Sequence, residues 1–146
     1  MIAVTVFNAH PGHRIRRAGV IAAVRRVAEG ERRRRAAVSV VFVGNRVSAR
    51  MNKRFLGHVG GTDVISFPLG EGRVIEGEVY INLDRARIQA REYGVGFADE
   101  VCRLVVHGTL HLFGYDDKTV ALERHMKRRE DRYVGVPASV RGHRRI

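Results

Sequence analysis

Cysteine is almost absent from this chain of 146 residues, with Cys102 as its only example. A single cysteine cannot form an internal disulfide, which is typical of proteins that stay in the reducing cytoplasm. It also argues against a structural zinc site, because such sites usually close with four ligands, often cysteines.

Long apolar runs and a targeting leader are also missing. No stretch approaches the roughly 18 consecutive apolar residues of a membrane-spanning helix. The first residues, Met1 to Phe7, lack the basic leader and small-residue cleavage site of a signal peptide and instead have the pattern of a β-strand. We therefore expect a cytoplasmic location and no contact with a membrane.

Lysine is scarce, with only Lys53, Lys118 and Lys127, so arginine supplies nearly all of the positive charge. Such a skew can arise from a G+C-rich genome without selection for binding. The formal net charge of +12 is nevertheless large for this length, and a basic surface attracts polyanions and speeds their encounter. The charge excess favours contact with nucleic acid, while the basic runs at 32–35 and 141–145 are also compatible with a solvated loop and tail.

Hydrophobic periodicity divides the chain into strands and helices. Short alternating or β-branched runs predict four strands, at Ile2–Asn8, Ala37–Val43, Asp63–Pro68 and Glu78–Asn82. Apolar residues at helical spacing predict five helices, at His13–Glu29, Arg46–Leu56, Asp84–Tyr93, Asp99–Phe113 and Thr119–Tyr133. Gly30 and Gly94 are expected to end two of these helices, and Asn45 to cap the second helix.

These elements predict an α+β fold, with one mixed sheet of about four strands packed by helices. The length fits one domain with a single core. We expect this domain to span residues 1–135, followed by a basic C-terminal tail at 136–146. The sequence contains no internal repeat, low-complexity tract or linker that would divide it further.

The most informative stretch of the sequence runs from His107 to Asp117 and reads HGTLHLFGYDD. His107 and His111 are four residues apart, so they lie one above the other on a single helix face. Gly114 offers a left-handed end to that helix, after which the chain can turn back and deliver a third ligand from residues 115–117. Two neutral imidazoles and a carboxylate suit Zn²⁺ and leave a fourth position open for water, as in catalytic zinc sites.

A pair of histidines at this spacing is weak on its own, because it is common on helices that bind nothing. The surrounding residues favour metal binding, because these histidines lie on the most apolar helix of the chain. Its apolar residues are Leu104, Val105, Val106, Leu110, Leu112 and Phe113. At least one histidine must then be partly buried, where an imidazole needs a partner. A metal ion would satisfy both rings at once.

The same stretch resembles the signature of the YbeY family of bacterial endoribonucleases, also called rRNA maturation factors. That signature reads HGxLHLxGYDH, and residues 107–117 match all of it except the last position. Two other blocks agree in order and spacing: TDVISFP at 62–68 resembles the TDVLSFP strand of the family, and GEVYI at 77–81 resembles its GDI strand. The resemblance extends over residues 2–135.

By this resemblance, the three zinc ligands of the family fall on His107, His111 and Asp117, with one zinc ion per chain. The third ligand is histidine in the family, so an aspartate keeps a ligand but adds negative charge to the site. Asp116 is the alternative ligand. We place it instead behind the metal ligands, where it would orient a histidine.

A second departure concerns an arginine that is implicated in catalysis in the family and stands after the short helix. Leu56 occupies that position here. Arg54, two residues earlier, and His58, two residues later, are the candidates to contact a scissile phosphate in its place. Of these two, Arg54 is the residue that we name as a catalytic candidate.

The resemblance implies a single-strand-specific, zinc-dependent endoribonuclease. It implies a role in ribosomal RNA processing (16S rRNA 3′-end maturation), ribosome biogenesis and its quality control. The implied partners are ribosomal RNA and the small ribosomal subunit, with its proteins or an assembly GTPase. Gly108 stands where the glutamate of an HExxH metalloprotease would act as base, which argues against a protease and leaves the general base unassigned.

Two alternatives remain open from the sequence. The first is a non-catalytic assembly factor that zinc stabilises and whose basic surface binds ribosomal RNA. The second is a metal-dependent hydrolase of a small molecule, which fits the metal site but does not need the positive surface.

Overall fold

The structure, a computed structural model, describes residues 1–57, 61–70 and 74–134. It contains four strands: β1 (Ile2–Asn8), β2 (Ala36–Val43), β3 (Val64–Leu69) and β4 (Ile75–Asn82). The described residues also form five helices: α1 (Arg17–Gly30), α2 (Asn45–Leu56), α3 (Leu83–Tyr93), α4 (Phe97–Leu112) and α5 (Val120–Val134). The tail expected at 136–146 and the candidate His58 lie outside the described residues.

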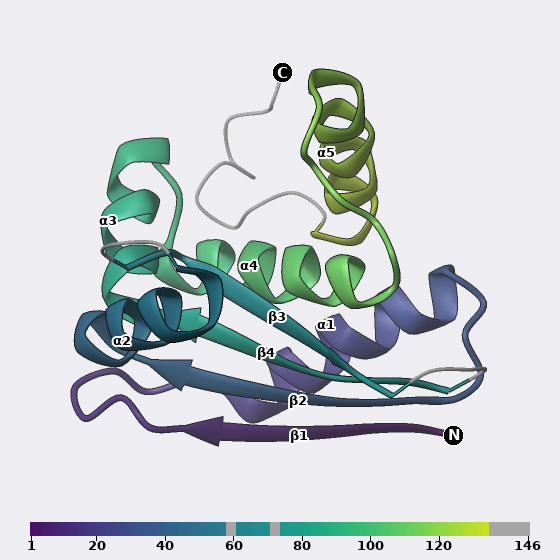
Figure 1. The fold of residues 1–146 in the computed structure, drawn as a ribbon, viewed down its shortest axis with the longest axis horizontal. Helices are drawn as coiled ribbons and strands as arrows, with labels where there is room; N and C mark the ends of the chain where they lie inside the picture. The colour runs from purple at the N-terminus through teal and green to yellow at the C-terminus, as the bar shows by residue number, and fades with distance from the viewer. Residues whose placement is uncertain (58–60, 71–73, 135–146) are drawn as a thin grey trace.

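The four strands form one sheet in the order β1-β2-β4-β3 (Figure 1). β1, β2 and β4 run parallel, and β3 pairs antiparallel with β4 at the edge. Parallel neighbours need a crossover, which α1 provides between β1 and β2. The chain from β2 to β4 passes through α2 and β3. The α+β fold with one mixed sheet packed by helices is therefore confirmed.

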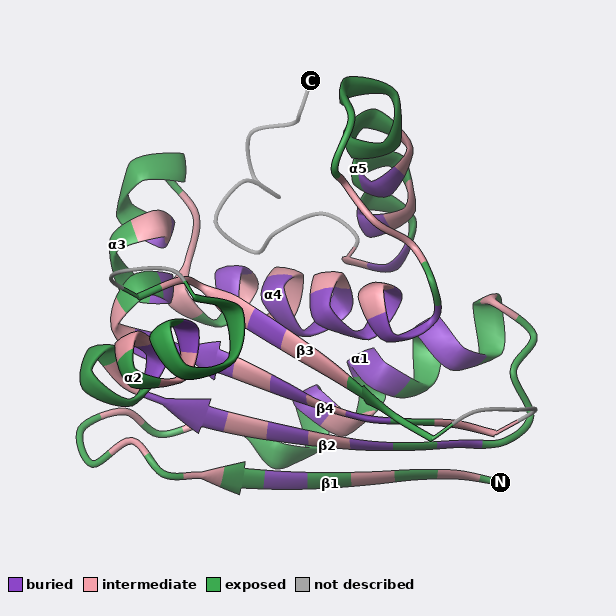
Figure 2. Cartoon of the chain, viewed as in Figure 1, coloured by how far each residue is buried: buried purple, intermediate pink, exposed green. Residues whose placement is uncertain are grey.

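The core lies between the sheet and the helices on one of its faces, where α1 and α4 turn their buried sides toward the strands (Figure 2). Successive side chains of a strand point to opposite faces, so alternate residues of β2, such as Val38 and Val40, are buried in this core. The other face of the sheet keeps exposed apolar side chains, including Phe7 on β1 and Leu69 on β3. The two faces of the sheet therefore present very different surfaces.

α4 is the central helix and packs against α1, α3, α5, β3 and β4. Gly108 allows its close approach to the sheet, because a Cβ at this position would overlap Val79 and lie 3.0 Å from Val64 Cγ2. Ser66 Oγ also donates a hydrogen bond to the Gly108 carbonyl oxygen over 2.9 Å. Although α4 is strongly apolar, no helix in the described ranges is long and apolar enough to span a membrane.

The first helix begins later than the sequence predicts, at Arg17 instead of His13. The segment before it is held by polar contacts with its own backbone. His10 Nδ1 accepts hydrogen bonds from the backbone N–H groups of Gly12 (2.9 Å) and His13 (3.2 Å), and Asn8 Nδ2 donates to the His13 carbonyl (2.8 Å). Helical periodicity was present in this segment, but these side chains satisfy the backbone in a loop conformation instead.

One expectation about a helix end is also corrected. The residue that caps α2 is Gly44, while Asn45 lies inside the helix and its side-chain oxygen accepts a hydrogen bond from Asn82 Nδ2 (2.9 Å). Gly30 does end α1, but the left-handed residue is Arg32, with φ of 58°. Gly30 is needed for another reason, because a Cβ there would overlap the ring of Tyr133 from α5. Gly94 ends α3 in the left-handed conformation that the sequence predicts.

Candidate metal centre

Three possible metal ligands converge where α4 meets the turn after it. His107 Nε2 and His111 Nε2 are 3.1 Å apart. The two carboxylate oxygens of Asp117 lie 3.6 Å from His107 Nε2 and 3.8 Å from His111 Nε2. Around a tetrahedral zinc ion with bonds of about 2.0–2.1 Å, ligand atoms are about 3.3 Å apart. The three side chains therefore have the spacing of a tripod that could hold one such ion.

The turn that carries Asp117 is built from the backbone at the end of α4. Gly114 has φ of +101°, a value that favours glycine, as the sequence predicts. The backbone N–H of Tyr115 donates to the Leu110 carbonyl over 3.1 Å, and that of Gly114 donates to the His111 carbonyl, also over 3.1 Å. These bonds satisfy carbonyl groups at the end of the helix. They reverse the chain so that Asp117 returns to the two rings.

Glu130 of α5 contacts the side of the His107 ring that faces away from His111 and Asp117, and so orients the ring. Its carboxylate, only 3% exposed, forms a short hydrogen bond with His107 Nδ1. A carboxylate accepts, so Nδ1 carries the hydrogen and the lone pair of Nε2 faces His111 and Asp117. Sequence reasoning missed this residue. A signal was present, since Met126, Glu130 and Tyr133 form the buried stripe of α5 and a charge in such a stripe requires a partner.

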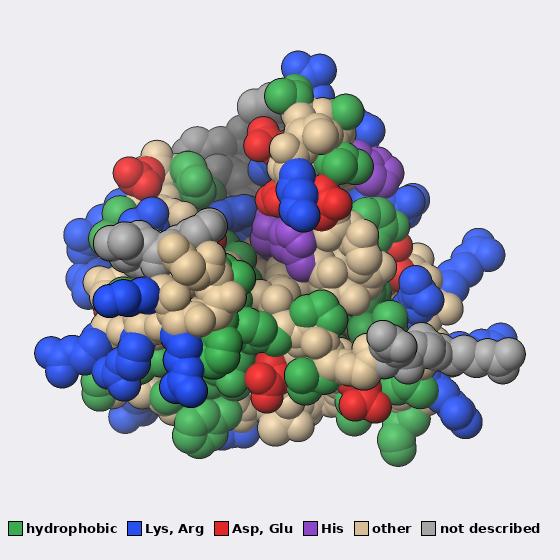
Figure 3. Space-filling model, viewed as in Figure 1, with side chains coloured by type: hydrophobic (Ala, Val, Ile, Leu, Met, Phe, Trp, Pro, Cys, Tyr) green, Lys and Arg blue, Asp and Glu red, His purple; other side chains and the backbone are tan. Residues whose placement is uncertain are grey.

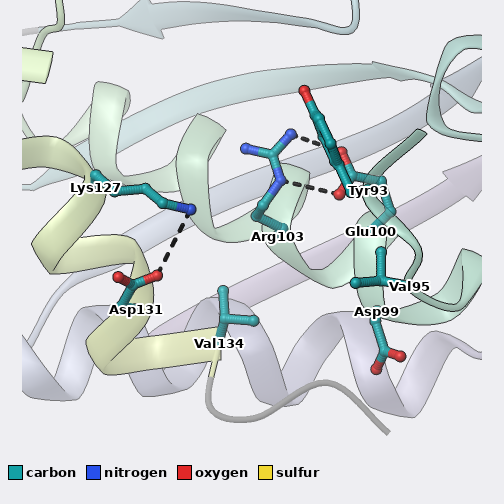
Figure 4. A pocket seen from close by; sticks show the side chains of 8 residues that line it. All are labelled: Tyr93, Val95, Asp99, Glu100, Arg103, Lys127, Asp131 and Val134. Carbon is teal, nitrogen blue, oxygen red and sulfur yellow. Dashed lines mark hydrogen bonds and ion pairs between the residues drawn. The ribbon is translucent and has the colours of Figure 1, made fainter. Parts of the chain in front are cut away.

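An ion-paired arginine supports Glu130 in turn. Arg103 Nη1 donates to Glu130 Oε1 over 3.4 Å. The same guanidinium donates two hydrogen bonds to Glu100, from Nε to Oε1 at 3.0 Å and from Nη2 to Oε2 at 2.6 Å (Figure 4). Glu100 is 1% exposed, and a two-pronged bond of this kind fixes the guanidinium plane. A chain of ion pairs and hydrogen bonds thus connects Glu100 through Arg103 and Glu130 to His107.

Arg103 also forms one wall of a pocket of about 400 Å³ between the ends of α3 and α5 and the start of α4 (Figure 4). The two cations that line this pocket already have carboxylate partners. Arg103 pairs with Glu100, and Lys127 Nζ lies 3.8 Å from Asp131 Oδ1. The Tyr93 ring lies 5.7 Å from the Arg103 guanidinium. Because these cations are already ion-paired, the pocket is poorly suited to bind a phosphate.

The second ring, His111, is set up to remain neutral. Burial, together with the charge that His107 can carry, lowers the pKa of the His111 imidazole below its ordinary value. The charge of Asp117 and a backbone hydrogen bond with Tyr115 act in the opposite direction and raise the pKa. Because a metal ion binds only the neutral ring, a lowered pKa keeps His111 available at neutral pH.

Asp116, which the sequence led us to place behind the metal ligands, bonds the backbone of its own turn. Its Oδ1 accepts a hydrogen bond from the backbone N–H of Lys118 over 3.1 Å. The carboxylate that contacts a histidine from behind is therefore Glu130, which approaches from another helix. The physical reason is local, because an aspartate in a turn readily bonds the N–H two residues later and so stabilises the turn itself.

Glu31, at the end of α1, joins the metal-bearing turn to α5. It accepts hydrogen bonds from the hydroxyl groups of Tyr115 (2.5 Å) and Tyr133, and from Arg129 Nη1 (3.3 Å). Burial by itself would raise the pKa of the Glu31 carboxyl, but these hydrogen bonds lower the pKa below its ordinary value. An ionised Glu31 thus holds both the turn of Asp117 and the helix of Glu130.

A second group of possible ligands, His10, His13 and Asp84, lies at the other end of the sheet. His10 Nδ1 accepts two backbone N–H groups, so Nε2 carries the hydrogen and donates it to Asp84 Oδ1 over 2.8 Å. The other oxygen of Asp84 accepts from the Asn45 N–H over 2.9 Å. This group could also hold an ion, but an ion would displace those hydrogen bonds. We therefore take His107, His111 and Asp117 as the candidate metal centre.

Comparison with known proteins decides the family. A sequence model described as Endoribonuclease YbeY matches residues 13–136. The chain belongs to the YbeY family. Endoribonuclease YbeY of Chlorobaculum tepidum is 44% identical over 97 residues, which cover 66% of this chain and 71% of that protein. Endoribonuclease YbeY of Chloroherpeton thalassium is 37% identical over 136 residues, which cover 93% of each.

The fold is also found among solved structures. The solution structure of TM1509 from Thermotoga maritima superimposes with a TM-score of 0.62 at 26% sequence identity. The match covers 90% of this chain and 86% of that one. The similarity therefore extends over nearly the whole YbeY-family domain and supports the arrangement of strands and helices described above.

The two departures from the YbeY signature occupy different places in the fold. Asp117 lies within the group of possible ligands, where the signature led us to expect histidine. Leu56, at the position of the expected arginine, is the last residue of α2 and is exposed. Arg54 is also exposed, and its guanidinium carbon lies 5.5 Å from the centre of the Phe55 ring. Only the first departure belongs to the metal centre itself.

Proposed function

We propose that this YbeY-family protein is a zinc-dependent endoribonuclease that cleaves single-stranded RNA. The observation that carries the proposal is the tripod of His107 Nε2, His111 Nε2 and Asp117, within a family described as endoribonucleases. The net charge of +12 supports a polyanionic substrate. A small-molecule hydrolase would not need that charge.

The donor set fits zinc. Two imidazole nitrogens and one carboxylate oxygen match the nitrogen and oxygen ligands of catalytic zinc sites, and three protein ligands leave one position open. When bound, zinc would polarise a phosphoryl oxygen and lower the pKa of a water molecule toward about 7. The residues of the chain have supporting roles: Glu130 holds the proton on His107 Nδ1, and burial lowers the pKa of His111 and so favours its neutral form.

We further propose that the substrate is ribosomal RNA, with a role in 16S rRNA 3′-end maturation, ribosome biogenesis and quality control in the cytoplasm. The partners would then be the small ribosomal subunit and its proteins or an assembly GTPase. The family description and the basic charge support an RNA partner. The domain proposed for this activity is residues 1–135, with the basic tail at 136–146 as an accessory segment.

One alternative function has a specific observation in its favour. Leu56 stands where the family signature led us to expect a catalytic arginine. A protein without that arginine could bind ribosomal RNA, with zinc only stabilising the contact between α4 and its following turn. This non-catalytic assembly factor would keep metal and RNA binding but lack cleavage.

A cleavage assay separates the two functions. Metal-stripped protein, the same protein with one equivalent of zinc, and the His111→Ala variant are incubated with single-stranded and duplex RNA of ribosomal sequence. We expect cleavage of the single strand by the zinc-loaded protein alone. RNA binding without cleavage in the zinc-loaded wild type would support the assembly factor instead.

Arg54 is proposed as the substitute for the missing arginine. If its guanidinium contacts the scissile phosphate, Arg54→Ala should reduce cleavage by about 10–100-fold, because a charge-assisted bond of about 1.5–3 kcal/mol is lost. Binding should weaken much less, since many other cations contribute. Rates and affinities measured at two salt concentrations test this, with removal of residues 141–146 as the control. Unchanged cleavage in Arg54→Ala would exclude this role.

A further inference from the structure

All the charged side chains of helix α2 are basic. Its sequence contains no acidic residue, and its exposed cations are Arg46, Arg50, Lys53 and Arg54. Residues four or seven apart share one side of a helix, so these cations form a stripe along α2. The opposite side is anchored by Ser48, whose hydroxyl donates to the Thr62 carbonyl (3.0 Å) and accepts from the Thr62 N–H (3.1 Å). The stripe therefore faces solvent.

An exposed aromatic ring stands at the end of this basic stripe. Phe55 is 56% exposed in the last turn of α2. Its ring is held by an edge-to-face contact with Phe67 of β3, with centres 5.4 Å apart. Phe67 contacts Tyr80 of β4 in the same way at 5.7 Å. Arg54 places a cation beside the ring. Phe55 is thus a positioned aromatic surface next to several positive charges.

Carboxylates on β4 border the aromatic side chains of β3 and limit where a polyanion can bind. In the register of β3 with β4, Phe67 lies opposite Glu78, and Leu69 lies opposite Glu76. Side chains in directly opposed positions lie on the same face of a sheet, so these carboxylates border the aromatic cluster. They repel a phosphate backbone from the rest of the open sheet face. A polyanion that contacts Phe55 is therefore directed along α2 and away from β1.

This surface adjoins the element that packs against the metal-bearing helix. α2 is followed in the chain by β3, and Ser66 of β3 bonds the carbonyl of Gly108, next to His107. In the space-filling view, Lys and Arg side chains gather over α2, and histidine side chains are visible in a hollow on the same face of the molecule (Figure 3). One bound strand could contact both regions.

We propose that the basic stripe of α2 and the ring of Phe55 form a docking surface for single-stranded RNA beside the metal centre. The inference rests on the proposed function. The cations contact the phosphates, and one base stacks on Phe55. Bases in a duplex are already stacked on their neighbours and cannot offer a face, whereas single strands can. Phe55 is then a residue that selects single strands.

The absence of tryptophan from the chain allows a direct test. Phe55→Trp introduces the only tryptophan, whose fluorescence should be quenched when a base stacks on it. Phe7→Trp is the matched control, because Phe7 is equally exposed, at 59%, but lies on β1. Zinc-loaded protein is titrated with a 2′-O-methyl-substituted single strand and with its duplex, and gels confirm that the strands stay intact. We expect quenching only for Phe55→Trp with the single strand.

Affinity provides the second measurement. Phe55→Ala should weaken single-strand binding by about 5- to 150-fold, from about 1–3 kcal/mol per stacked base, and leave the salt dependence unchanged. Arg50→Ala should instead lower the slope of log affinity against log salt by about 0.7. Phe55→Tyr should restore wild-type binding, and Phe7→Ala should have no effect.

The outcomes separate this inference from the proposed function. If the wild type binds and cleaves single-stranded RNA but Phe55→Trp is not quenched and Phe55→Ala binds normally, the docking surface is wrong and the enzyme assignment stands. Equal losses for single strands and duplexes in Phe55→Ala would also overturn the selection by stacking. If labelled RNA does not bind the wild type at all, both proposals fail together.

Discussion

Replacing His107 by alanine is expected to abolish both stoichiometric zinc binding and RNA cleavage. The change removes one of the three ligands, and the remaining imidazole and carboxylate cannot enforce a tetrahedral site. It also leaves Glu130, which is buried, without its hydrogen-bond partner. Elemental analysis of freshly purified protein and a zinc titration measure the first loss, and the RNA assay measures the second. One equivalent of tightly bound zinc in His107→Ala would refute the proposed metal centre.

Glu130→Gln provides a graded comparison for this result. Glutamine keeps an oxygen that can accept from His107 Nδ1 but removes the negative charge that supports the ring. Loss of such a supporting partner typically costs about 10–100-fold in metal affinity. We expect Glu130→Gln to fall in that range, between the wild type and His107→Ala. Thermal unfolding of the metal-free proteins shows how much of each loss comes from destabilisation of the fold.

The second large effect concerns the two aspartates of the turn. Asp117→Ala is expected to lose zinc affinity by much more than the about 10–100-fold typical of an outer partner. Asp116→Ala should have a smaller effect, because the Asp116 carboxylate accepts a hydrogen bond from the backbone N–H of Lys118 and stabilises the turn. The third variant, Asp117→His, should retain zinc and reproduce the three-histidine set of the family signature. Competition with a chromophoric chelator measures all three affinities.

A greater loss in Asp116→Ala than in Asp117→Ala would reverse this ligand assignment. Cobalt substitution gives an independent check, because the visible absorption spectrum of bound Co²⁺ reports the coordination geometry. Asp117→His should bind Co²⁺ with an altered spectrum, since a nitrogen replaces an oxygen. An unchanged spectrum in Asp117→His would show that residue 117 is not a ligand.

Most of the secondary structure could be predicted from the sequence because its signals are local. The alternation in β1 and the helical spacing in α4 are properties of neighbouring residues. The pairing of His107 with His111 follows from the same helical geometry, and the positive φ of Gly114 follows from the conformational freedom of glycine. The YbeY resemblance added Asp117 as the expected third ligand, and in the structure Asp117 lies in one group with His107 and His111 that could hold a metal ion.

Local patterns were insufficient where a side-chain hydrogen bond competes with the expected secondary structure. The helical periodicity near His13 did not produce a helix, because His10 and Asn8 bond the backbone of that segment. Asparagine is a common N-cap residue, yet the side chain of Asn45 accepts a hydrogen bond from Asn82, which is distant in the sequence. In both places, side-chain hydrogen bonds outweigh propensities that are worth only fractions of a kcal/mol per residue, about 0.7 or less.

The sequence by itself determined the type of fold, the basic character of the surface and the two histidines that share a helix face. Only the tertiary structure identified the supports of the metal centre. Glu130 reaches His107 from another helix, and Glu31 joins Tyr115 to Tyr133 from a third. The physical reason is that ligand spacing on one helix depends on its own geometry, whereas the partner of a buried charge depends on which helices pack together.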